Sequence, residues 1–226
     1  MEHAHEDRGT RHGPHEQGTP RRGLPTRWMA VGLAAAAAAT ATAVVTGGSA
    51  QAERPDARTT LRLADGRAVG TVAFYDDPRL QRTQVRVSLD LPRGVTPLNA
   101  FHGFHVHANG DGAGCVADPS APSSTWFTAV GGHYARPGQP HAYHAGDMPS
   151  LLVNRDGTVS MTFTTARFSP EQLEGRAVIL HDDEDNFGNV PVGSGADEYR
   201  PGPDALAVTR STGNAGDRIA CGVVRR

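Results

Sequence analysis

From residue 53 to the C-terminus, apolar residues occur in short runs that alternate with polar ones, and this pattern is the strongest constraint on how the chain can fold. The stretch 85–91 shows the alternation most clearly, as expected for a strand that buries one face. Turn signals that contain Asp-Gly lie at 64–67 and 154–157, each between two such runs. The pattern therefore predicts strands joined by tight turns.

Three long loops rich in Gly, Pro and Asp separate the strands, at 108–132, 134–147 and 182–217. Loops of this length within a compact domain are usually either functional or disordered. The 3.6-residue period of a helix is not sustained after residue 53, and only 170–173 favours one short helical turn. We therefore predict an all-β fold, an antiparallel Greek-key β-sandwich or barrel that carries long functional loops.

The first 52 residues differ in composition from the rest of the chain. A polar segment ending in arginines at 21, 22 and 27 precedes an alanine-rich apolar run at 28–45, and Ala50-Gln51-Ala52 follows. This order predicts a secretory signal peptide at 1–52 and a mature domain at 53–226. The alternative is a permanent membrane anchor, but alanine is weakly apolar and the cleavage pattern follows at once. The mature domain is expected to be exported, secreted or associated with the cell envelope, without stable membrane insertion.

Charge and cysteine content narrow the class of protein further. The formal net charge is only −2, so nothing indicates nucleic acid as a partner. The two cysteines, Cys115 and Cys221, are either free thiols or one disulfide, and the compartment decides between the two. Because the leader indicates export, we expect the disulfide.

Histidines are concentrated in the expected mature domain, which holds seven of the eleven. His105 and His107 stand two apart in a strand-like run, so both imidazoles share one face with about 7 Å between Cα atoms, and Val106 points into the core. His141, His144 and Asp147 crowd into seven residues of loop. Imidazole nitrogens suit copper or zinc, and the added carboxylate favours zinc for the second cluster. A lone His-x-His pair is often chance, but six clustered histidines predict a metal centre.

Four motifs, in combination and in order, resemble the copper/zinc superoxide dismutases, and the bacterial exported branch in particular. They are Gly-Phe-His-Val-His at 103–107, Gly-Gly-His-Tyr at 131–134, His-Ala-Gly-Asp at 144–147, and Thr-Gly-Asn-Ala-Gly-Asp-Arg-Ile-Ala-Cys-Gly-Val at 212–223. The resemblance covers most of the chain after the leader. It implies copper-dependent dismutation of superoxide to dioxygen and hydrogen peroxide, with copper and zinc as cofactors.

The resemblance also implies a role for each site residue. The copper ligands would be His105, His107, His133 and His181. The zinc ligands would be His133, which bridges the two metals, together with His141, His144 and Asp147. His133 would also carry a catalytic proton, Arg218 would hold the anionic substrate, and Asp185 would hydrogen-bond to ligand histidines of both metals. Cys115 and Cys221 match the family's disulfide, and His102 matches a packing histidine.

Two alternatives stay open. His141 and His144 are only three residues apart, where most family members have a longer excursion. The shortened loop either folds around zinc, since all four ligand types remain, or binds it weakly and leaves a copper-only enzyme. The rival function is a non-catalytic copper-binding or copper-delivery module of the same fold, which predicts the loss of a copper ligand or of Arg218. The sequence leaves the oligomeric state unknown.

Overall fold

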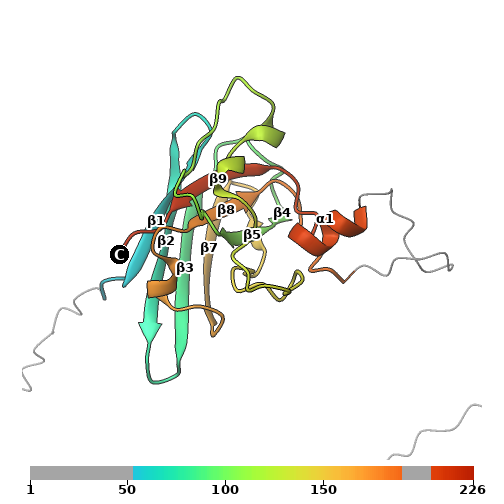
Figure 1. Cartoon of the computed structure of the whole chain (residues 1–226). Coiled ribbons are helices and arrows are strands. Elements are labelled where there is room, and N and C mark those ends of the chain that lie inside the picture. The colour runs from blue at the N-terminus through green and yellow to red at the C-terminus, as the bar shows by residue number, and fades with distance from the viewer. Residues whose placement is uncertain (1–52, 190–204) are drawn as a thin grey trace, which may run out of the picture. The chain divides into compact units, whose positions relative to one another are not determined.

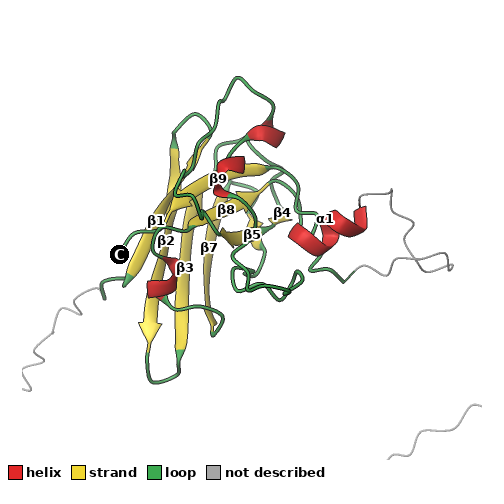
Figure 2. Ribbon diagram, viewed as in Figure 1, coloured by secondary structure: helices red, strands yellow, loops and turns green. Residues whose placement is uncertain are grey.

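Strands form the framework of the computed structural model, which describes residues 53–189 and 205–226 (Figures 1 and 2). In chain order they are β1 (Ala57–Leu63), β2 (Ala68–Asp77), β3 (Arg82–Asp90), β4 (Ala100–His102), β5 (Phe104–His107), β6 (Leu151–Val153), β7 (Thr158–Thr165), β8 (Ala177–His181) and β9 (Arg218–Val223). The expected signal peptide at 1–52 lies outside the described residues.

Seven of the strands form one antiparallel sheet with the order β5-β8-β9-β1-β2-β3-β7, and β4 pairs with β6 in a small second sheet. The chain therefore returns repeatedly to strands far back in the sequence, with β9 beside β1 and β7 beside β3. The prediction of an all-β, antiparallel Greek-key fold is confirmed. The expected turn at 154–157 is present, but the two strands that it joins belong to different sheets.

The alternation in the sequence corresponds to one-sided burial. Every second residue of β1 is buried, beginning with Ala57, and the same holds for β3 from Thr83 onwards. In contrast, β5 and β8 are buried on both faces. Val178 and Leu180 of β8 pack in the main core, whereas Ala177 and Ile179 pack in a second cluster beneath the loops. This loop-covered outer face of β5 and β8 is where the histidines lie.

A disulfide joins Cys115 to Cys221, with 5.5 Å between the Cα atoms. It fixes the first long loop to β9 and lies within the second apolar cluster, beside Phe127 and Ile179. The expected cysteine pairing is confirmed.

The structure contains an α-helix that the sequence pattern did not predict. α1 spans Ala205–Thr212 within the third long loop, and Gly213 ends it with a φ of 65°, a left-handed conformation that favours glycine. The first long loop carries two short 3₁₀ turns, η1 (Ser123–Thr125) and η2 (Thr128–Val130), and the expected turn at 170–173 is the 3₁₀ turn η3 (Pro170–Leu173). Among the described residues, no helix is long and apolar enough to cross a membrane.

Candidate metal centre

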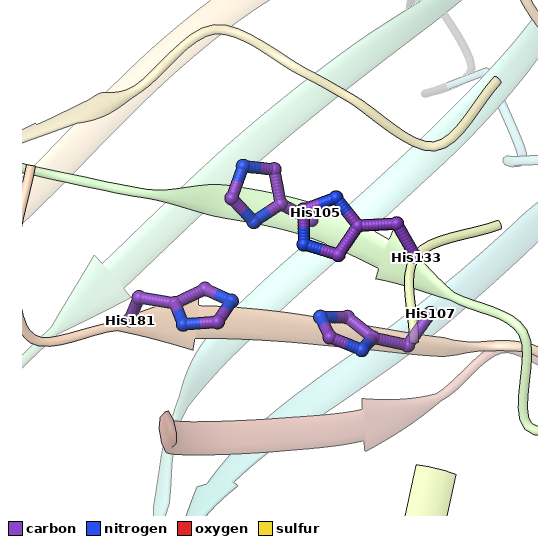
Figure 3. Close-up of side chains that lie close together, drawn as sticks. All are labelled: His105, His107, His133 and His181. Atoms are coloured by element: carbon purple, nitrogen blue, oxygen red, sulfur yellow. The ribbon is translucent and has the colours of Figure 1, made fainter. Parts of the chain in front are cut away.

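Four histidines turn toward one another on the outer face of β5 and β8 (Figure 3). His105 and His107 come from β5 and His181 from the end of β8, while His133 follows the first long loop. Their rings are buried, and each offers one nitrogen within 4.8 Å of the corresponding nitrogens of the others. The alternation of β5 places Val106 in the main core, as the sequence predicts, and so leaves both flanking histidines on the same face.

One nitrogen of each imidazole has a partner that orients the ring. His107 Nδ1 lies 2.8 Å from the Gly131 carbonyl oxygen, and His181 Nδ1 lies 3.2 Å from that of Gly216. His105 Nε2 lies 2.7 Å from Asp185 Oδ2. Because carbonyl and carboxylate oxygens accept hydrogen bonds, these nitrogens carry the proton, and the opposite nitrogen of each ring keeps its lone pair.

The other ring nitrogen of each of the four histidines is buried and has no hydrogen-bond partner. These nitrogens are His105 Nδ1, His107 Nε2, His133 Nε2 and His181 Nε2. Buried polar atoms are nearly always satisfied, so four unpartnered nitrogens that face a common point require an explanation. A four-nitrogen donor set suits copper or zinc, and the residues present therefore fit a metal ion at this position.

A second cluster lies next to the first and shares His133 with it. His133 Nδ1 is 2.8 Å from Asp147 Oδ1 and 3.3 Å from His144 Nδ1. His144 Nδ1 is 3.3 Å from Asp147 Oδ1, and His141 Nδ1 is 3.2 Å from Asp147 Oδ2. Ligands about 2.0–2.1 Å from a tetrahedral zinc ion lie about 3.3 Å apart. The carboxylate of Asp147 therefore lies within 3.3 Å of one nitrogen of each of the three histidines, a spacing compatible with a shared zinc ion.

A second set of four residues also has donor atoms that all lie within 4.8 Å of one another. Its members are His105, His133, His141 and Asp147. It thus includes His105 in place of His144. We favour His144 as the fourth member, because the Nε2 of His105 is already bonded to Asp185 and its Nδ1 faces the first cluster.

Asp185 links the two clusters. Its Oδ2 accepts a hydrogen bond from His105 Nε2 at 2.7 Å and its Oδ1 accepts one from His141 Nε2 at 2.8 Å. The backbone N–H of Phe187 also donates to Oδ1 at 2.7 Å. Gly213 passes so close that a Cβ atom there would collide with this carboxylate. The loop thus holds one carboxylate between one histidine of each cluster.

Burial and hydrogen bonds set the protonation states. Burial lowers the pKa of His107 and of His181 well below the ordinary value, and burial lowers that of His133 to about 4. These rings are therefore neutral at pH 7, as metal ligands must be. Burial alone would lower the pKa of His141, but the hydrogen bonds and charges of Asp147 and Asp185 outweigh it and raise the value to about 9.

Both carboxylates are ionised. Burial alone would raise the pKa of Asp147 and of Asp185, but hydrogen bonds from the histidines hold both values well below the usual range. The first cluster therefore offers neutral imidazoles, and the second adds the negative charge of Asp147 and Asp185, which attracts a cation. His141, whose pKa is raised, must give up its proton to bind a metal.

Arg218 begins β9 beside the first cluster. Its guanidinium donates to the carbonyl oxygens of Phe127 and Gly131, each at 2.7 Å. The Gly131 oxygen also accepts the hydrogen bond of His107, so Arg218 and a histidine of the cluster are held by one backbone atom. The guanidinium is half-buried and its position is fixed by the loop rather than by a carboxylate.

Two features of the site had no signal in the sequence pattern. α1 supports the second cluster, because the backbone N–H of His141 donates to the Arg210 carbonyl oxygen at 3.1 Å. Arg167 contacts the same loop, through the carbonyl oxygens of Ala142 and His144. His102 stays outside both clusters and bonds to backbone carbonyls, as expected for a packing histidine.

Comparison with known proteins agrees with this geometry. The family model for copper/zinc superoxide dismutase matches residues 68–224. A superoxide dismutase [Cu-Zn] of Mycolicibacterium paratuberculosis is 34% identical over 184 residues, covering 78% of this chain and 77% of the relative. A protein of the same description from Mycobacterium tuberculosis is 33% identical over 184 residues, covering 76% of this chain and 72% of the relative.

A solved structure supports the fold. The crystal structure of the clock protein EA4 superimposes with a TM-score of 0.52 at 24% identity and covers 76% of this chain and 95% of that protein. The family model spans the strands from β2 to β9 and both histidine clusters. The chain belongs to the copper/zinc superoxide dismutase family.

Proposed function

We propose that the protein catalyses the dismutation of superoxide to dioxygen and hydrogen peroxide. The observation that carries the proposal is the set of four buried, unpartnered imidazole nitrogens around one point. His105 Nδ1, His107 Nε2, His133 Nε2 and His181 Nε2 would hold copper. Bound copper supplies the electron exchange, because it alternates between two oxidation states and zinc does not.

His133 has a special place in this proposal because both of its nitrogens face metal positions. Its Nε2 belongs to the copper set, and its Nδ1 lies with the zinc set of His141, His144 and Asp147. Each turnover consumes two protons and two superoxide ions. His133 would carry one of these protons on Nε2 and pass it to the superoxide that is reduced. Water would supply the other proton, and the product would leave as hydrogen peroxide.

The residues of the second cluster fit zinc, and a zinc ion there would have a structural role. It would hold Nδ1 of His133, so that Nε2 stays aimed at the copper position. Asp185 would orient His105 and His141 together, since partners of this kind fix the tautomer and the direction of a ligand ring.

Arg218 supplies the positive charge that the anionic substrate needs. Fixed charge beside a reaction centre stabilises an anion there and raises its rate of encounter. Replacing Arg218 with alanine is expected to lower the rate by about tenfold or more and to flatten its dependence on ionic strength. Arg155→Ala, which removes an exposed arginine in the turn between β6 and β7, is the matched control. A variant of Arg218 with the wild-type rate and salt response would exclude this residue from the mechanism.

The rival function is a copper-binding or copper-delivery module of the same fold. The presence of all four histidines and of Arg218 favours the enzyme. The test is metal analysis of the purified protein, paired with a dismutation assay. Activity is expected only with copper bound, and zinc alone is expected to give none. Fully copper-loaded protein without activity would replace the enzyme with the delivery module.

We also infer that the protein acts outside the cytoplasm. The leader at 1–52 has the order of a secretory signal, and the disulfide between Cys115 and Cys221 suits an oxidising compartment. Amino-terminal sequencing of the exported protein tests this, with cleavage expected after Ala52. A chain that keeps residues 1–52 at the membrane would contradict it.

A further inference from the structure

The loop that carries His141, His144 and Asp147 has few bonds of its own. The N–H of Tyr143 donates to the Pro140 carbonyl oxygen at 2.9 Å, and Asp147 and His144 bond to each other across one turn. Gly146 packs so closely that a Cβ atom there would collide with the backbone of Val106. These contacts fix the end of the loop at β5, but they leave the carbonyl oxygens on its outer side to be satisfied elsewhere.

Arg167 satisfies those carbonyl oxygens. It follows β7, and its Nη1 donates to the oxygens of Ala142 at 2.8 Å and His144 at 3.0 Å. The same nitrogen lies 3.5 Å from the oxygen of Asp147. One guanidinium nitrogen therefore contacts the carbonyl oxygens of three residues. Two of these, His144 and Asp147, are proposed zinc ligands, and the third directly follows His141. A guanidinium is planar and rigid, so it holds such acceptors in a defined arrangement.

Among the described residues, the guanidinium of Arg167 hydrogen-bonds only to this loop. In the described part of the chain, no carboxylate lies within ion-pair distance of it. Its remaining bond is local, from its backbone N–H to Thr165 Oγ1. The side chain also lines a hollow of about 400 Å³ with Met148, Phe163 and Phe187.

We propose that Arg167 is a positioning residue for zinc. It touches none of the donor atoms, and it holds the short loop in the shape that brings Nδ1 of His133, His141 and His144 together with Asp147. A loop with only two residues between its histidines has little chain to order itself, and the hydrogen bonds from Arg167 to its carbonyl oxygens compensate for this. The inference rests on the proposed zinc site and goes beyond it, because it assigns the affinity of that site to a residue outside it.

The experiment compares zinc affinity in the purified, disulfide-bonded protein and in Arg167→Gln, by competition with a chromophoric chelator. Loss of a residue that orients metal ligands is expected to raise the zinc Kd by about 10–100-fold. Arg155→Gln removes an equal charge from an exposed turn and is expected to bind zinc as the wild type does. Cobalt(II) in place of zinc gives a second readout, since its visible absorption reports distortion of a tetrahedral site.

Two further measurements separate positioning from general stability. The copper Kd, measured with zinc absent, and the melting temperature of the metal-free protein are both expected to stay near the wild-type values in Arg167→Gln. A zinc Kd equal to that of the wild type would overturn the proposal. A rise in zinc Kd that is matched by an equal rise in copper Kd would also overturn it, because it would mean that the whole domain is weakened.

His141→Ala distinguishes failure of this inference from failure of the zinc site. If His141→Ala loses zinc and Arg167→Gln keeps it, the site stands and the positioning role is wrong. If wild type and His141→Ala bind zinc alike, the site itself is wrong and the role of Arg167 falls with it.

Discussion

Replacing His105 with alanine is expected to abolish both superoxide dismutation and stoichiometric copper binding. The variant loses Nδ1, one of the four unpartnered nitrogens, and also the 2.7 Å hydrogen bond to Asp185 that orients the ring. Loss of a residue that merely orients a ligand costs about 10–100-fold in metal affinity or activity, so loss of the ligand is expected to cost more than about 100-fold. The copper content and the dismutation rate of the purified variant measure this directly.

His102 provides the matched control, because it is a buried histidine outside both clusters. Its ring nitrogens lie 3.0 Å from the carbonyl oxygen of His181 and 2.9 Å from that of Pro97. His102→Gln is therefore expected to lower the melting temperature and to keep copper. Full copper content and a wild-type rate in His105→Ala would contradict the proposed ligand set. Equal loss of copper in both variants would assign the effect to folding rather than to ligation.

Removal of the disulfide has the largest expected effect on stability. Cys115 and Cys221 are 106 residues apart, and the chain-entropy model assigns about 4–5 kcal/mol to a loop of that length. For a domain of this size, each kcal/mol shifts the melting temperature by about 2–4 °C. The double variant Cys115→Ser with Cys221→Ser is expected to melt about 8–20 °C below the wild type in a thermal unfolding experiment.

A reductant supplies the control for this prediction. It is expected to lower the melting temperature of the wild type toward that of the double variant and to leave the double variant unchanged. A double variant that melts with the wild type would show that the apolar cluster around Phe127 and Ile179, rather than the covalent bond, holds the first loop against β9.

The sequence predicts the parts of the fold in which burial is one-sided. β1 and β3 are long enough to show an alternation, and they bury every second residue. β4 and β6 have three residues each, too few for a period to be read, so their separate sheet had no sequence signal. α1 was missed for a related reason. It has eight residues, and its apolar side chains Leu206 and Val208 are exposed, so no stripe faces a core.

The residues of the candidate site were likewise predictable only in part. Strand parity alone places His105 and His107 on one face, and the family resemblance extends the set to the other five predicted metal-site residues. Arg167 could not be foreseen, because it acts on carbonyl oxygens of Ala142 and His144. Which backbone atoms an arginine meets depends on tertiary packing, and a lone arginine after a strand has the same pattern as an exposed one.

The position of β9 in the sheet has a consequence for the order of events during synthesis. β9 is the last strand made, yet it lies between β8 and β1, the first strand made. Contacts between distant segments form late in folding. Without β9, β8 is paired on one side only, with β5, and neither Arg218 nor the partner of Cys115 is present. The four histidines of the first cluster all precede β9 in the sequence, whereas the arginine beside them and the disulfide both depend on this strand.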